Sequence, residues 1–188
     1  MELPPKRVET RRLVLRPCRP AEAPLLREAI DSSLDHLRAW MRWAMSEPSS
    51  LEETRERINT SLNRFEKGED FAYCIFPRSE EAVFGGIGLH RRAGPDCLEI
   101  GYWMGAGQVG LGYGTEAVTA LAAVGLELAG IGRIKIECDP ANQASVRVAQ
   151  KAGFSLVERR SGDKLTPSGE PRDTLVFEVR SVEAVPDT

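Results

Sequence analysis

Apolar and polar residues change their spacing at Gly68. Before it, apolar residues recur at helical intervals in "PAEAPLLREAI", "SLDHLRAWMRWAM" and "LEETRERINTSLNRFEKG", which predicts three helices. Ser50 and Glu53 are placed to form a capping box at the start of the third helix, and Gly68 is placed to end it. The alternating segment "RRLVLRPC", ahead of these helices, predicts an opening strand.

After Gly68 the pattern becomes that of a sheet. The segments "DFAYCIFP", "EAVFGGIGLHRR" and "CLEIGYWMG" are rich in aromatic and branched residues and are separated by turns, which predicts an antiparallel meander. A helix over about 115–129, a strand "GRIKIECDP", a short helix "NQASVRVAQKAGF" and two strands, "SLVERRS" and "DTLVFEVRS", follow. We therefore predict one α+β (mixed α/β) domain over residues 1–188, with its core at about 10–180 and short flexible tails.

Composition narrows the class of protein. The chain has 188 residues, 41% of them hydrophobic, and a formal net charge of −3, which gives no general case for nucleic-acid or membrane binding. Four scattered cysteines and two histidines make a metal site unexpected, so no metal is predicted. The first residues lack the apolar run of a signal peptide, and we expect a cytoplasmic protein.

A glycine-rich segment stands directly before the predicted helix at 115. The stretch "MGAGQVGLGYGTEAVTA" holds five glycines within eleven residues. Bare backbone amides at a helix N-terminus bind phosphate. A Walker loop would need Lys after Gly114, where Thr115 and Glu116 stand, and the spacing does not fit a Rossmann fingerprint. A pyrophosphate cradle for another cofactor and a flexible tight turn both stay open.

Four short sequence motifs, found in family order and at family spacing, decide between the cradle and the tight turn. "EIGYW", "GLGYGTEA", "DPANQAS" and "KAGF", together with the early "LRAWMRWA", resemble the GNAT superfamily of acetyl-CoA-dependent N-acetyltransferases, and within it the RimJ/RimL branch of ribosomal-protein N-terminal acetyltransferases. The similarity covers roughly residues 10–179. It implies a GNAT-like fold, whose central, largely antiparallel, seven-stranded twisted sheet has a local parallel pair and flanking helices.

The resemblance also implies an activity. Acetyl-CoA would be the cosubstrate, and its acetyl group would pass in a ternary complex to a primary amine, with a peptide or protein N-terminal α-amino group as the first expectation. An antibiotic, a polyamine or an amino acid is an alternative acceptor. A non-catalytic acyl-CoA-binding module and a nucleotide-binding module are alternatives to an enzyme. A homodimer is an expectation at the level of the family.

The cofactor site follows from the same resemblance. Backbone amides of the glycine loop would bind the coenzyme A pyrophosphate. The family usually has Gln or Arg where Val109 stands, and Gln108 lies one residue early. Either one side-chain contact is missing, or Gln108 supplies it from a shifted loop. The expected cofactor-binding residues are Val109, Gly110, Leu111, Gly112, Tyr113, Gly114, Thr115 and Asn142.

Removing a proton from the ammonium form of the acceptor calls for a nearby acid residue. Glu99 is the first candidate: Leu98, Ile100 and Tyr102 would share one face of their strand and leave Glu99 on the other. The family often places its base, or an acid that holds a water, on this strand. Glu137, the polar member of another alternating strand, is the second candidate, and a water chain is the third.

The departing thiolate needs a proton in return. Many superfamily members use a tyrosine seven residues after the equivalent of Asn142, where this chain has Ala149. The ribosomal-protein branch instead has a serine three residues after this Asn. Ser145 stands at that position, and the resemblance makes it the expected proton donor. In this family the early helices form one lip of the acceptor groove. The expected substrate-binding residues are Trp40, Trp43 and Trp103.

Overall fold

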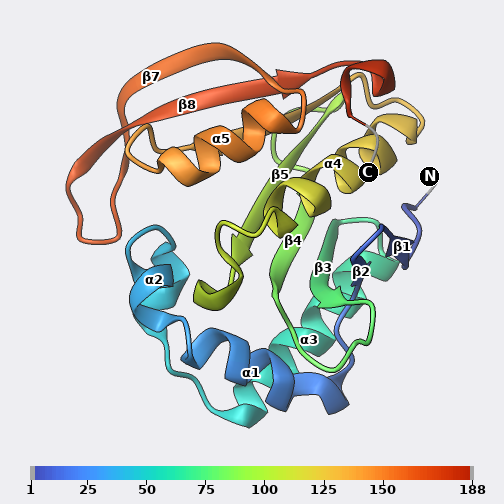
Figure 1. Ribbon diagram of the computed structural model, residues 1–188, viewed down its shortest axis with the longest axis vertical. Helices are drawn as coiled ribbons and strands as arrows, with labels where there is room; N and C mark the ends of the chain where they lie inside the picture. Colours follow the sequence, from blue (N-terminus) through green and yellow to red (C-terminus); the bar gives the residue numbers. More distant parts are fainter. Residues whose placement is uncertain (1–2, 187–188) are drawn as a thin grey trace.

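A computed structural model of the chain describes residues 3–186. Its strands form a single mixed sheet in the order β1-β2-β3-β4-β5-β6-β8-β7 (Figure 1). Every neighbouring pair is antiparallel except β5 and β6, so the predicted largely antiparallel sheet with a parallel pair is confirmed. The strands are β1 (Val8–Glu9), β2 (Leu13–Arg16), β3 (Asp70–Pro77), β4 (Gly85–His90), β5 (Cys97–Met104), β6 (Arg133–Cys138), β7 (Ser155–Leu165) and β8 (Pro171–Val179).

The predicted count of seven strands is wrong by one. The eighth is β1, which has two residues and pairs with β2 through Val8↔Leu15 and Glu9↔Val14. Two residues are too few to show an alternating pattern, so this strand forms only because β2 offers it an edge. The predicted meander, by contrast, is confirmed as β3-β4-β5.

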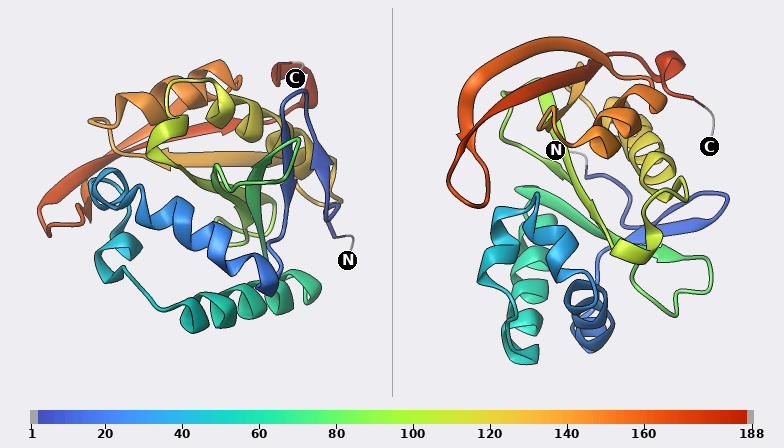
Figure 2. Two further views of the ribbon diagram at one scale, coloured as in Figure 1. Left: turned by 60° about the horizontal axis from the view of Figure 1, so that its bottom comes forward. Right: turned by 60° about the vertical axis from the view of Figure 1, so that its left-hand side comes forward.

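Helices cover both faces of the sheet. Figure 2 (left) shows α4 and α5 on one side of the strands and α1, α2 and α3 on the other. Leu13 and Leu15 of β2 pack in the core that contains α4, while Val14 packs with α1 and α3, as the alternation of a strand requires. The helices are α1 (Ala23–Asp31), α2 (Leu34–Arg38), α3 (Leu51–Glu66), α4 (Tyr113–Glu127) and α5 (Gln143–Lys151), with 3-10 turns η1 (Pro20–Glu22), η2 (Arg42–Ser46), η3 (Ala106–Gln108) and η4 (Val182–Ala184).

The predicted continuous helix "SLDHLRAWMRWAM" is wrong. It ends at Arg38, Met41 is extended (φ −109°, ψ 109°), and the chain resumes as η2. The Arg38 guanidinium donates to the carbonyls of Ala44 at 3.3 Å and Glu47 at 2.7 Å, which folds the segment back on itself. These contacts are tertiary and therefore invisible to helical periodicity. We call residues 34–46 the lip.

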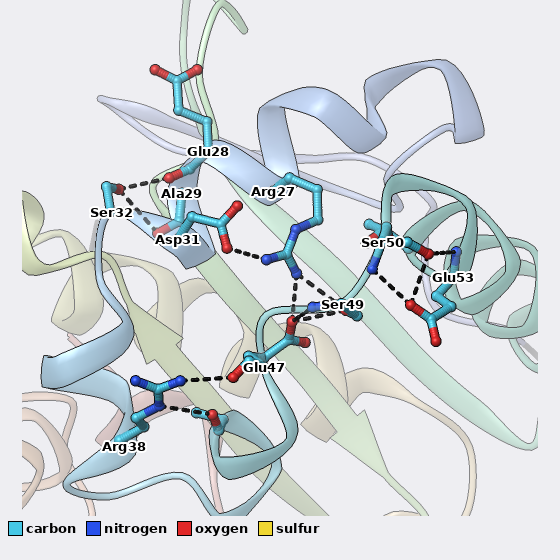
Figure 3. A network of polar contacts seen from close by, with 12 residues as sticks. Arg27, Glu28, Ala29, Asp31, Ser32, Arg38, Glu47, Ser49, Ser50 and Glu53 are labelled. Carbon is cyan, nitrogen blue, oxygen red and sulfur yellow. Dashed lines mark hydrogen bonds and ion pairs between the residues drawn. The ribbon is translucent and has the colours of Figure 1, made fainter.

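A buried ion-pair network fixes the end of the lip (Figure 3). The side chain of Glu47 is 1% exposed and lies 2.6 Å from Arg27 of α1 and 2.7 Å from Arg57 of α3. Ser49 donates its backbone amide and its hydroxyl to the same carboxylate, and Arg27 also pairs with Asp31. Burial raises the pKa of Glu47, but these hydrogen bonds outweigh it and bring the pKa to about 2.

The capping box predicted at the start of α3 is confirmed. Ser50 accepts from the backbone amide of Glu53, and the Glu53 carboxylate accepts from the backbone amide of Ser50. Within residues 3–186, no helix combines the length and the apolar character needed to cross a membrane.

Candidate active site

Strands β5 and β6 part from one another partway along their length. They pair in parallel only at Cys97↔Arg133, Leu98↔Ile134 and Glu99↔Lys135. Beyond these pairs β5 continues to Met104 and β6 to Cys138, so the sheet opens between them. Backbone groups and side chains that a closed sheet would cover are thereby available to ligands on both faces.

Two cavities meet at this opening. The cofactor-side cavity, of about 380 Å³, lies between the lip, the loop 108–115 and α5. The acceptor-side cavity, of about 690 Å³, lies between the lip, the open ends of β5 and β6, and the β7–β8 hairpin. Figure 1 shows this hairpin curving until its loop stands beside α2. The residues that line both cavities are Trp40, Met41, Tyr102, Asn142 and Ser145.

The loop before α4 has the backbone geometry of an anion cradle. Gly110 and Gly112 have φ of +81° and +82°, values that L side chains rarely adopt, and a Cβ at Gly110 would meet open space. Among the described residues, no protein acceptor is found for the backbone amides from Val109 to Thr115. Unpaired amides at the positive end of a helix fit a pyrophosphate group.

Most of the predicted cofactor-binding residues line the cofactor-side cavity. They are Val109, Gly110, Gly112, Gly114, Thr115 and Asn142, and Gln108 lines it as well. The structure does not bring the side chains of Leu111 and Tyr113 to it. Leu111 is 54% exposed, and the Tyr113 ring packs against Phe84 at a centroid distance of 5.1 Å.

Arg12 is a residue of this region that the sequence analysis missed. Its guanidinium lies 2.6 Å from Glu116 in the first turn of α4 and donates to the Leu111 carbonyl at 3.0 Å. A Cβ on Gly112 would come within 3.2 Å of it. Arg12 therefore places a positive charge beside the unpaired amides. No local pattern marks this residue, because it stands just before β2, far away in the sequence.

A tyrosine and a serine meet at the opening. Tyr102 of β5 donates its hydroxyl to Oγ of Ser145 at 3.0 Å, and burial raises the pKa of Tyr102 to about 12. The Asn142 side chain accepts from the Ser145 amide at 3.0 Å and so caps α5. Burial raises the pKa of the neighbouring Cys138 thiol, although a hydrogen bond with Ser145 lowers it.

Tyr102 is the second residue that the sequence analysis missed. Its predicted face is correct: Leu98 and Ile100 on the same face are buried in the core. Tyr102 differs because it lies beyond the last β5–β6 pair, where β6 no longer covers it, and it lines both cavities. The alternating pattern identified the face of the strand, but not the point at which the sheet opens.

The two candidate bases lie in one chain of ion pairs. Glu99 is 8% exposed and lines the acceptor-side cavity, with Arg92 Nε at 3.0 Å and Lys135 Nζ at 3.3 Å. Lys135 also lies 2.6 Å from Glu137, which pairs with Lys164 of the hairpin. Burial raises the pKa of Glu137, but hydrogen bonds from Lys135 and Lys164 bring it to about 2. A carboxylate of that acidity is a poor proton acceptor near neutral pH.

The predicted aromatic residues are divided between two settings. Trp40 lines both cavities and Trp103 lines the cofactor-side cavity. Trp43 is not among the described lining residues of either cavity, but its ring packs edge-on against Trp103 at a centroid distance of 5.9 Å. Trp103 in turn lies over Gly86, where a Cβ would be 2.5 Å from its indole nitrogen.

Comparison with known proteins agrees with this geometry. A family model described as an acetyltransferase (GNAT) domain matches residues 12–155, which is more than half of the chain. The fold and the open parallel pair define the class as a GNAT acetyltransferase domain. The chain belongs to this family, and the predicted membership is confirmed.

Individual relatives are similar to parts of the chain, and solved structures to its fold. It is 32% identical to Bacillus subtilis YjcK, named as a probable N-acetyltransferase, over 56% of this chain and 59% of YjcK. It is 27% identical to the Escherichia coli ribosomal-protein-serine acetyltransferase over 63% of this chain and 68% of that protein. A RimL ribosomal L7/L12 α-N-protein acetyltransferase, solved with coenzyme A, has the same fold: the TM-score is 0.82 at 23% identity, covering 96% of this chain and 99% of that chain.

Proposed function

We propose that this protein transfers the acetyl group of acetyl-CoA to a primary amine, and that the amine is the α-amino group of a peptide or protein N-terminus. The observation that carries the proposal is the pair of cavities that meet at the opened β5–β6 edge and share Tyr102, Asn142 and Ser145. A thioester bound in the cofactor-side cavity is then open to attack by an amine bound in the acceptor-side cavity. This arrangement supports direct attack in a ternary complex.

The cofactor-side cavity suits coenzyme A. The unpaired amides from Val109 to Thr115 match a pyrophosphate in hydrogen bonding, and Arg12, which is ion-paired with Glu116, lies beside the same loop. Arg147 and Lys151 of α5 add positive charge to the same cavity. Coenzyme A or acetyl-CoA is bound in solved neighbours of this fold, including a RimL enzyme and the microcin C7 self-immunity acetyltransferase MccE. Acetyl-CoA is accordingly the proposed cosubstrate.

The chemistry needs two proton transfers. As the amine nitrogen bonds to the acetyl carbon and the carbon–sulfur bond breaks, the nitrogen loses a proton and the thiolate gains one. We assign the first proton to Glu99, directly or through water, because it lines the acceptor-side cavity and Glu137 is too acidic. We assign the second to Ser145. Since Tyr102 donates to Ser145 Oγ, the serine proton is left to point elsewhere, and the tyrosine can resupply it.

The lip carries the remaining acceptor contacts. Trp40 lines both cavities, and the Trp103 ring packs edge-on against Trp43. These aromatic side chains would enclose the acceptor backbone beside the thioester. Related enzymes are named for acetylating ribosomal proteins, which supports a protein N-terminus as the acceptor.

The test measures thiol release from acetyl-CoA with short peptides that have free N-termini. Copies of the same peptides with an acetylated N-terminus are the matched control and should release none. Glu99→Gln should lower kcat/KM about a hundred-fold at pH 7, and much less at about pH 9.5, where the α-amine is already deprotonated. A loss of equal size at both pH values would remove Glu99 from the base role. Tight acetyl-CoA binding without turnover of any amine would instead identify an acyl-CoA-binding module.

A further inference from the structure

Positive charge gathers around the acceptor-side cavity. Three of its lining residues are carboxylates, Glu99, Glu137 and Asp139, and twice that number are cations, so the lining carries a formal excess of three positive charges. The whole chain has a formal net charge of −3. The sign of this cavity is therefore opposite to that of the molecule. The cations are Arg42, Arg92, Lys135, Arg160, Lys164 and Arg172.

The carboxylates of the cavity are already committed to these cations. Glu99 pairs with Arg92 and Lys135, and Glu137 pairs with Lys135, Lys164 and Arg160. Glu137 is 7% exposed at its side chain, so each of its oxygens faces cations and not water. No carboxylate in this chain of ion pairs is left over to bind a cationic acceptor.

Two arginines on opposite walls of the acceptor-side cavity have guanidinium N–H groups available to donate hydrogen bonds to a ligand. Arg42 of η2 is exposed and, within residues 3–186, forms no ion pair. Arg172 of β8 lies 3.7 Å from Asp139, beyond hydrogen-bond distance, and its side chain is 22% exposed. The lip and the hairpin that carry them approach one another in every view of the fold (Figures 1 and 2). An anion between the two walls would meet guanidinium groups on both sides.

We propose that the acceptor amine carries anionic groups, carboxylate or phosphate, which bind between the lip and the β7–β8 hairpin. This inference rests on the proposed function and names the chemical class of its acceptor. An acidic N-terminal peptide and a small phosphate-bearing amine share this chemistry. Polyamines and other cationic acceptors are opposed by it, because like charges repel in a partly desolvated cleft.

The same charge assists the reaction. A positive environment disfavours an ammonium ion and so lowers the pKa of an incoming amine, which increases the fraction present as the neutral nucleophile. The anionic groups of the acceptor would hold it in place despite this repulsion. Selection of the acceptor and activation of its amine thus draw on one set of residues.

The experiment compares acceptors that differ only in charge. Peptides of equal length have Asp, Asn or Lys at the second and third positions after the same free N-terminal residue. The expected kcat/KM for the Asp peptide exceeds that for the Asn peptide by about ten-fold or more, with the Lys peptide lowest. Raising the ionic strength from about 50 mM to about 500 mM should reduce the differences in kcat/KM among the three peptides, since salt screens the interaction between the peptide charges and the cavity cations.

A second arm distinguishes the source of the anion. 2-Aminoethyl phosphate is compared with ethanolamine, its neutral counterpart, under the same conditions. Preference for the phosphate compound over every peptide supports an anionic acceptor with phosphate as the anion. Preference for the Asp peptide supports carboxylate. Equal rates across charged and neutral acceptors in both arms would overturn the proposal.

Variants test the assigned residues. Arg42→Glu and, separately, Arg172→Gln should lower the ratio of the Asp-peptide to the Asn-peptide kcat/KM by about ten-fold. Arg55→Glu is the matched control, because Arg55 of α3 is partly exposed, lines neither cavity and, among residues 3–186, forms an ion pair with Glu52 alone; it should leave the ratio unchanged. Acetyl-CoA affinity, measured for each variant, verifies the fold. An unchanged ratio in both cavity variants contradicts the assignment.

Binding separates this inference from the proposed function. Calorimetric titration measures the Asp and Asn peptides on the protein loaded with coenzyme A, without turnover. If no peptide is acetylated but the Asp peptide binds about ten-fold more tightly, the anion inference stands and the proposed activity fails. If the Asn and Lys peptides are acetylated as fast as the Asp peptide, the activity stands and the anion inference fails.

Discussion

Glu47 holds the lip to α1 and α3, and its removal has a calculable effect on stability. The pKa of this carboxyl is about 2 in the folded chain, against an ordinary value of 4.5. At about 1.4 kcal/mol per pKa unit, the ionised group contributes roughly 3 kcal/mol to the free energy of unfolding at pH 7. Because the folded pKa is the lower one, this contribution is complete above pH 4.5 and is lost as the pH falls toward 2.

Glu47→Gln keeps the shape and removes the charge. We expect it to lower the free energy of unfolding by about 3 kcal/mol at pH 7, because Arg27 loses its buried partner. At pH 3.5 part of that contribution is already lost from the parent protein, so the difference should shrink by about 1.5 kcal/mol. Urea denaturation followed by tryptophan fluorescence at the two pH values measures both quantities.

The matched control is Glu52→Gln. Glu52 forms an exposed ion pair with Arg55 on the same helix, and its side chain is 69% exposed. Such pairs contribute little, so we expect a change below about 0.5 kcal/mol at either pH. The reasoning about Glu47 is refuted if its variant loses less than about 1 kcal/mol at pH 7, or if the loss is the same at both pH values.

Two further predictions concern the cofactor-side cavity. Gly112→Ala places a side chain at φ +82° and 3.2 Å from Arg12, so the Kd for acetyl-CoA should rise about ten-fold in equilibrium titration. Gly107→Ala, where a Cβ meets open space, should leave that Kd in place, and equal effects would count against the cradle. Tyr102→Phe removes the donor to Ser145 and should lower kcat about ten-fold or more at constant acetyl-CoA affinity. A parallel loss of affinity would assign Tyr102 to binding instead.

Local sequence patterns predicted those parts of the fold that local interactions decide. The capping box of Ser50 and Glu53 and the meander β3-β4-β5 were predicted because their signals span a few neighbouring residues. The helix expected over the lip was wrong because Arg38 bonds carbonyls six and nine residues away. Helical periodicity indicates which face of a segment is apolar. It does not indicate which backbone carbonyls the Arg38 side chain will bond in the folded chain.

The candidate site divides in the same way. The glycine run by itself left a tight turn and a cradle open, and the resemblance of the neighbouring motifs to the GNAT superfamily decided for the cradle; the positive φ of Gly110 and Gly112 fits that choice. Arg12 reaches that loop from the residue before β2, about a hundred residues earlier, and Tyr102 gains its position from the place where β5 and β6 part. Neither arrangement leaves a local trace. Only the assembled sheet brings Arg12 to the glycine loop and Tyr102 to the cavities.

The hairpin shows why the character of the acceptor was not predicted. The sequence indicated a strand "SLVERRS" that stops at Ser161, whereas β7 runs on to Leu165 and carries Lys164 to Glu137. Its extension passes through an irregular register between Arg160 and Lys164, where alternation fails. The cations that the β7–β8 hairpin adds to the acceptor-side cavity, Arg160, Lys164 and Arg172, therefore lie in the part of the chain with the weakest alternating pattern.

The base and the acceptor site are linked through Lys135. This lysine donates to Glu137 and lies 3.3 Å from Glu99, so any group that draws it away leaves the Glu99 carboxylate with one donor fewer and more open to a hydrogen bond from the acceptor amine. An anionic acceptor would compete with Glu99 and Glu137 for the same cations, whereas a cationic acceptor would only add another positive charge. The pH-dependent loss caused by Glu99→Gln should therefore be larger with the Asp peptide than with the Asn peptide. Equal losses with both peptides would mean that the acceptor charge acts on binding alone.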